Sequence, residues 1–119
     1  MKLEIGQFAR LKSGYYDELG IGKIDFVANC GVATIDFKNK KLGVFASDIV
    51  KASYNIIDIL EVGDYVNGRE AVDIFYDAND DAMDVCVLGS IVYDNNEVKS
   101  VITHEQMEQM AYKVGDDKK

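Results

Sequence analysis

The chain contains one five-residue pattern twice: it reads IGQFA at residues 5–9 and VGDYV at residues 62–66, 57 residues later. Both copies place an aliphatic residue, a glycine, a polar residue, an aromatic residue and an aliphatic residue in the same order. A glycine followed by a strand whose aromatic side chain enters a small core is typical of the start of an SH3-like barrel. The repeat therefore predicts two related β modules, which we place at residues 1–58 and 59–119.

Alternation of apolar and polar side chains extends the β prediction over most of the chain. In the first module it predicts strands at residues 7–12, 20–27, 31–37, 42–45 and 49–51. In the second module it predicts strands at residues 71–76, 83–88, 91–93, 98–102 and 111–114. The predicted fold is therefore mostly β, with two small SH3-like antiparallel modules that either pack as one domain or stay separate.

Two segments carry helical signals. Thr103 and Gln106 form a capping-box pattern, which predicts one short C-terminal helix at residues 105–109. Residues 53–60 fit two structures: Ser53 is a good cap for a helical turn, whereas the β-branched pair at residues 56–57 suits a strand.

The composition is that of a globular chain, with 119 residues of which 48% are hydrophobic and 29% are charged. No apolar run reaches the length of about 18 residues that a transmembrane helix needs. The first residues also lack the apolar stretch of a signal peptide, so we expect a cytoplasmic protein. Cys30 and Cys86 stand in apolar, strand-like surroundings and are predicted to be reduced thiols that pack as small core residues.

The charge is unevenly distributed along the chain. The net charge is −8, of which residues 1–58 contribute +1 and residues 59–119 contribute −9. The densest acidic stretch contains Asp73, Asp77, Asp80, Asp81, Asp84, Asp94 and Glu97. These residues form either a solvated surface that keeps the protein soluble or a face that binds a basic partner protein. Direct binding of nucleic acid by this half is disfavoured, because phosphate contacts require lysine and arginine.

We find no sequence pattern for a catalytic centre, a bound cofactor or a metal site. His104 is the single histidine of the chain, and it is expected to be a solvated surface residue. The glycines at residues 20 and 22 lack the third glycine and the lysine of a phosphate-binding loop, so we expect a turn at the start of a strand.

The acidic loop at residues 77–82 resembles part of a calcium-binding EF-hand. It matches at Asp77, Asn79 and Asp81, but Ala82 replaces the required glycine and Leu88 replaces the final glutamate. The flanking segments are also predicted strands rather than helices. Only weak, adventitious cation binding at residues 80–81 is left from this comparison.

Two adjacent tyrosines stand in a predicted loop of the first module. Tyr15 and Tyr16 follow a serine–glycine pair, where packing into the core is less expected than in a strand. Exposed aromatic side chains are common anchors of protein interfaces. We therefore include both tyrosines among the candidate partner-binding residues.

Three stretches resemble a loose family of small proteins encoded by phages and prophages of Gram-positive bacteria. They are residues 55–68, the C-terminal stretch at residues 98–114 and the opening strand at residues 5–12. The resemblance implies an accessory protein that acts inside a bacterial host cell, and it carries over no catalytic residue. Some small acidic proteins of this kind inhibit CRISPR–Cas nucleases or other antiviral systems.

The leading hypothesis is an acidic inhibitor that occupies the nucleic-acid-binding surface of a defence nuclease, such as a CRISPR–Cas effector. One alternative is a phage structural or adaptor module that associates through an apolar patch. Another alternative is a protein that sequesters a nucleotide defence signal in a pocket with basic or aromatic walls, with Lys38, Lys40 and Lys41 as candidates. The oligomeric state stays open in all three.

Overall fold

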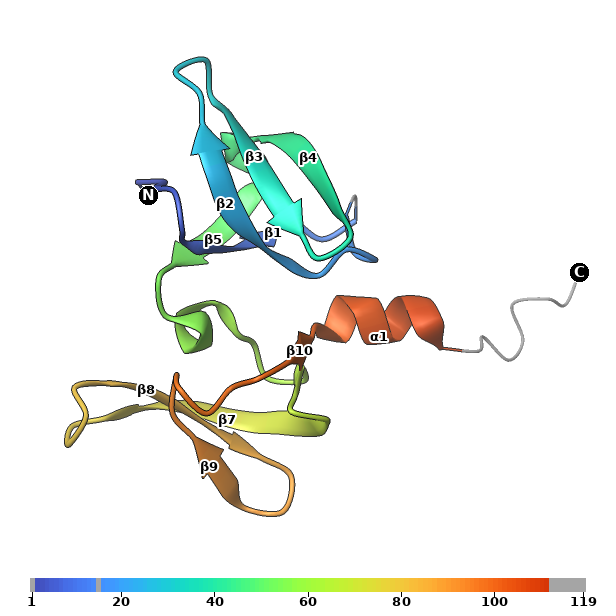
Figure 1. The fold of residues 1–119 in the computed structure, drawn as a ribbon. Helices are drawn as coiled ribbons and strands as arrows, with labels where there is room; N and C mark the ends of the chain where they lie inside the picture. Colours follow the sequence, from blue (N-terminus) through green and yellow to red (C-terminus); the bar gives the residue numbers. More distant parts are fainter. Residues whose placement is uncertain (1, 15, 112–119) are drawn as a thin grey trace, which may run out of the picture.

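The computed structural model describes residues 2–14 and 16–111. It is mostly β, as the sequence predicted, with two five-stranded antiparallel sheets (Figure 1). The first sheet contains β1 (Phe8–Leu11), β2 (Ile21–Val27), β3 (Val32–Phe37), β4 (Lys40–Phe45) and β5 (Ile49–Ser53). The second sheet contains β6 (Tyr65–Val66), β7 (Arg69–Asp77), β8 (Ala82–Val87), β9 (Ile91–Tyr93) and β10 (Val101–Ile102).

The two sheets have the same strand order. The first runs β4-β3-β2-β1-β5, and the second, taken from its other edge, runs β9-β8-β7-β6-β10. Each strand of the first sheet therefore has a counterpart five strands later at the same place in the second. This shared order agrees with the repeat in the sequence, while an SH3-like form of the modules stays a prediction.

The repeated pattern forms the same turn in both places. Gly6 and Gly63 have φ angles of 97° and 101°, which favour glycine, and each lies two residues before a strand. The side chain of Gln7 accepts a hydrogen bond of 2.8 Å from the Glu4 N–H. Asp64 accepts a bond of the same length from the Glu61 N–H. The repeat thus extends one residue further back than the pattern we recognised, to a glutamate in each copy.

Each sheet has its own apolar core. The first core contains Ile24, Ile35 and Phe37, which come from the buried faces of β2 and β3. The second contains Val66, Val85 and Val87, together with Ile57 and other side chains. Because Ile57 follows the first sheet in sequence but packs in the second core, the two modules share the connecting segment.

Three helices lie among the described residues. They are the short 3₁₀ helices η1 (Ala46–Asp48) and η2 (Ile56–Ile59), and the α-helix α1 (His104–Met110). The predicted capping box is present, since the Thr103 side chain accepts from the Gln106 N–H and the Gln106 side chain accepts from the Thr103 N–H. Segment 53–60 forms the helical turn η2 at residues 56–59, with Ile57 and Ile59 buried, but Ser53 ends β5 and the N-cap is Asn55. No described helix is long and apolar enough to cross a membrane.

The structure bears on the predictions for the two cysteines and for the strand at residues 111–114. Cys30 is exposed, so its prediction as a core residue is wrong; it lies in the turn between β2 and β3, outside the alternation of either strand. Cys86 is partly buried in β8. In the predicted strand at residues 111–114, Ala111 caps the end of α1, and residues 112–114 lie outside the described residues.

The two glycines near the start of β2 have different structural roles. Gly20 has a φ angle of 73° and precedes the strand, as expected for a turn. Gly22 lies within β2, and a Cβ atom there would collide with Cγ2 of Ile35. The absence of a side chain therefore lets the backbone of β2 lie against the first core.

One buried arginine joins the two modules. The side chain of Arg10, from β1, is 2% exposed, and its two terminal nitrogens donate to the carboxylate of Asp64 at 2.7 and 2.9 Å. Nη2 also donates to Glu105 of α1 at 2.7 Å, and Nη1 donates to the Ile59 carbonyl at 3.2 Å. All these partners belong to the connecting segment or the second module. Burial alone would lower the pKa of Arg10, but the hydrogen bond and the acidic neighbours raise it above its usual value.

Asp64 is fully buried and accepts two further hydrogen bonds, from the N–H groups of Glu61 and His104. Replacing it by alanine should lower the free energy of unfolding by about 3–5 kcal/mol, because Arg10 would remain buried without its counter-ion. Chemical denaturation of wild type and Asp64→Ala measures this difference. Asp25→Ala, which breaks an exposed ion pair with Lys41, is the control and should change little. Equal losses of unfolding free energy in the two variants would contradict the assignment of Asp64 as the buried counter-ion of Arg10.

Candidate binding surfaces

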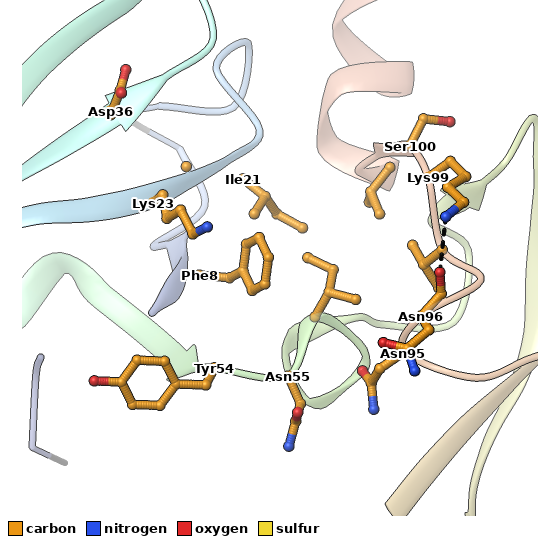
Figure 2. Close-up of a pocket in the computed structure, with 14 residues that line it drawn as sticks. Phe8, Ile21, Lys23, Asp36, Tyr54, Asn55, Asn95, Asn96, Lys99 and Ser100 are labelled. Carbon is orange, nitrogen blue, oxygen red and sulfur yellow. Dashed lines mark hydrogen bonds between the residues drawn. The ribbon is translucent and has the colours of Figure 1, made fainter. Parts of the chain in front are cut away.

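A cleft of about 570 Å³ lies between the two modules. Its walls come from β1, β2 and β3 of the first module, from residues 54–56 of the connecting segment and from residues 95–96 and 98–101 of the second module (Figure 2). Ligand pockets of proteins are commonly of about 300–1,000 Å³ and often lie at interfaces between domains. The size and position of the cleft therefore suit a small-molecule site.

The cleft has apolar walls and a polar opening. Apolar surface is supplied by Phe8, Ile21, Ile56, Val98 and Val101. Exposed polar groups are supplied by Lys23, Asn55, Asn96, Lys99 and Ser100. A few polar groups around an apolar surface are the usual composition of a site that orients a ligand.

Two lysines stand on opposite sides of this cleft (Figure 2). The Lys23 ammonium lies 5.1 Å from the centre of the Phe8 ring, and these residues are direct partners in the β1–β2 pairing. Lys99 donates from Nζ to the Asn96 carbonyl at 3.0 Å. Within the described residues, neither ammonium has a carboxylate at ion-pair distance. Asp36, the cross-strand neighbour of Lys23, is the one acidic residue that lines the cleft.

The lysines that we predicted for a pocket are elsewhere. Lys38 and Lys40 are exposed at the β3–β4 turn, and neither lines the cleft. Lys41 is paired with Asp25 at 2.9 Å. Their assignment to a pocket is therefore wrong, because a tight hairpin turn presents its side chains to solvent.

The predicted acidic residues gather at one end of the second module, but they are not one uniform surface. Asp73 and Asp80 are exposed, on β7 and in the following turn. Asp81 accepts a hydrogen bond from the Tyr76 hydroxyl. In the turn after β9, the carboxylates of Asp94 and Glu97 each accept from the N–H of the other residue, at 3.0 and 2.9 Å.

Asp84 is the exception, because it is 5% exposed. Our prediction that it belongs to an exposed binding face is wrong. Asp84 lies in β8, an inner strand of the second sheet, where it pairs with Phe75 of β7. One carboxylate oxygen of Asp84 and one from each of Asp77 and Asp80 all lie within 4.8 Å of one another.

None of the seven predicted acidic residues has a lysine, arginine or histidine at ion-pair distance within residues 2–14 and 16–111. The acidic residues around Arg10 are instead paired with it. The second module therefore carries one acidic cluster that has cationic partners, at the module interface, and one without such partners among the described residues.

The two predicted aromatic anchors contribute little here. Tyr15 lies outside the described residues. Tyr16 is partly buried and packs against the first core, which explains why an aromatic residue occupies this loop. Its predicted role as an exposed interface anchor is therefore wrong.

His104 is part of the charged network at the module interface. Its Nε2 lies 2.7 Å from Oε1 of Glu61, whose other oxygen lies 3.4 Å from both Arg10 Nε and Lys51 Nζ. Partial burial would raise the pKa of Glu61, but the hydrogen bond with His104 and the charges of Arg10 and Lys51 lower it below 4.5. The sequence offered one signal for this network: a charged Asp64 at the repeat position that Gln7 occupies in the first module.

Comparisons with protein-family models, with curated proteins and with solved structures find no match to this chain. The resemblance to phage-encoded proteins accordingly stays a prediction, and the binding surfaces must be judged by their own geometry.

The lowered pKa of Glu61 predicts a pH dependence of stability. A depressed folded-state pKa contributes stability above the unfolded value of about 4.5 and loses it as pH falls through the folded value. Wild type should therefore be more stable than Glu61→Gln at pH 7, and the difference should shrink below about pH 4.5. Urea midpoints between pH 7 and pH 3 measure it, with Glu18→Gln as an exposed control. A difference independent of pH would contradict the ionic role.

Proposed function

We propose that this protein is a binding protein that holds an anionic, ring-containing small molecule of the nucleotide class in the cleft between its modules. The observation that carries the proposal is the pair of lysines, Lys23 and Lys99, on either side of an apolar surface. On a chain with a net charge of −8, two ammonium groups at one cleft that lack ion-pair partners among residues 2–14 and 16–111 are a local reversal of charge.

The chemistry of the cleft fits the parts of a nucleotide. Ammonium groups bind phosphate oxygens through charge-assisted hydrogen bonds. The apolar wall around Phe8, Ile21 and Val101 suits the faces of a planar base. The exposed amides of Asn55 and Asn96 can donate to and accept from the edges of that base. Sequestration of a nucleotide signal is therefore the sequence hypothesis that this cleft supports, with different lysines from those predicted.

Titration calorimetry with a panel of mononucleotides and cyclic dinucleotides tests this proposal. At least one member should bind, and Lys23→Ala and Lys99→Ala should each weaken that binding about ten-fold or more, as expected for the loss of a charged hydrogen bond. Lys38→Ala removes the same charge from the β3–β4 turn and should bind as wild type does. The proposal fails if no nucleotide binds at millimolar concentration, or if all three variants bind equally.

A second candidate function is supported by the acidic cluster that lacks cationic partners among the described residues. We propose as the alternative that this end binds a basic nucleic-acid-binding protein, for which a bacterial defence nuclease such as a CRISPR–Cas effector is the case suggested by the sequence resemblance. Carboxylates without cationic partners attract lysine- and arginine-lined surfaces and speed association at low salt. Asp84 takes no direct part in such a contact, because it is buried.

Charge reversal at an exposed acidic residue distinguishes this alternative. Asp80→Lys should weaken retention of the nuclease in a pull-down from nuclease-treated lysate, and inhibition of its cleavage should weaken in parallel. Glu18→Lys makes the same charge change on the first module and should have no effect. Binding that survives both Asp80→Lys and high salt would eliminate the acidic end as the contact.

A further inference from the structure

The aspartates at the β7–β8 turn form a compact cluster. Asp77 ends β7, Asp80 lies in the turn and Asp84 is the third residue of β8. β7 and β8 pair side by side as an antiparallel hairpin, and one oxygen of each carboxylate lies within 4.8 Å of one oxygen of the other two. Three like charges at this separation repel one another unless a cation or a proton lies among them.

Asp84 supplies a second, independent observation. It is 5% exposed, and its Oδ1 atom is buried without a hydrogen-bond partner among the described residues. A buried polar atom without a partner costs about 1–3 kcal/mol, and native structures contain few of them. A bound ion is one of the usual reasons for such an atom.

The other buried aspartate among the described residues shows how such a group is normally satisfied. Asp64 is equally enclosed, but its carboxylate accepts two bonds from Arg10 and two from backbone N–H groups. Asp84 has no corresponding cation in the part of the chain that the structure describes.

We propose that Asp77, Asp80 and Asp84 form a binding site for a hard divalent cation, with Ca²⁺ preferred to Mg²⁺. Carboxylate oxygens are the ligands that both ions take. Ca²⁺ accepts about six to eight oxygen ligands in a flexible geometry, whereas Mg²⁺ requires a near-ideal octahedron and gives up its bound water reluctantly. Three carboxylates supplied by a strand end, a turn and a strand therefore suit Ca²⁺ better than Mg²⁺.

The local backbone supports this geometry. The Asp77 carboxylate accepts from the Asn79 N–H through Oδ1 at 2.9 Å, which fixes its orientation. The Asp80 N–H donates to the Asp77 carbonyl at 3.2 Å, which closes the turn. This set differs from the residues that matched the EF-hand pattern. Asp81 belongs to that pattern but not to this site, because its carboxylate accepts a hydrogen bond from the Tyr76 hydroxyl. The site is independent of the proposed nucleotide cleft, and it shares Asp80 with the acidic surface of the alternative function.

Calorimetric titration of the isolated chain with Ca²⁺, and separately with Mg²⁺, tests the site. Wild type should bind Ca²⁺ with a Kd of about 10⁻⁴–10⁻³ M, the range of weak extracellular modules, and should bind Mg²⁺ at least about ten-fold more weakly. Its melting temperature should rise with Ca²⁺ concentration. Asp84→Asn should remove both effects, while Asp73→Asn, on the exposed part of the same hairpin, should keep them.

A second readout guards against loss of folding. Asp84→Asn keeps the size of the side chain and removes a buried charge, so the metal-free variant should melt no lower than metal-free wild type. Circular dichroism and melting in a chelator verify this. Equal Ca²⁺ affinity in wild type and Asp84→Asn would mean an adventitious ion only and would overturn the proposal. A melting temperature of wild type that does not change with Ca²⁺ concentration would also overturn it, and would indicate a shared proton between Asp77 and Asp84.

Discussion

The buried ion pair between Arg10 and Asp64 is the contact on which the arrangement of the two modules depends. Neither module buries it alone, because the arginine comes from β1 and the aspartate lies next to β6. A buried charge costs several kcal/mol unless its partner is in place. The pair therefore disfavours any arrangement that separates the modules, and it holds the walls of the cleft, which come from both of them, at a defined distance.

The sequence repeat explains the position of this ion pair in the fold. Gln7 and Asp64 occupy the same position of the repeat, and both use a side-chain oxygen to close the same turn. The neutral amide needs no further partner, whereas the carboxylate needs a cation. The exchange of an amide for a carboxylate thus converts a local turn residue into an interface residue. Glu61 and Glu105 form ion pairs with the same arginine.

Much of the architecture could be predicted from sequence, because strand alternation, the repeat and the capping box are local patterns. The short helix begins within one residue of its expected start, and the strand segments are largely where the alternation places them. The binding surfaces could not be predicted in this way. Lys23 and Lys99 are 76 positions apart and meet across a cleft that only the packing of the modules creates. The burial of Asp84 in an inner strand depends on how the second sheet assembles, so a count of acidic residues placed it on the surface.

The same reasoning separates the two acidic groups of the second module, which the net charge alone cannot do. Of the two buried aspartates, Asp64 has a guanidinium within 2.7 Å, and Asp84 has other carboxylates as its neighbours. The first arrangement is stable because the two charges cancel. The second raises the free energy of the folded state unless a cation or a proton binds among the carboxylates. The far end of the second module is therefore where an external cation, whether an ion or a basic side chain of a partner, gains the most by binding.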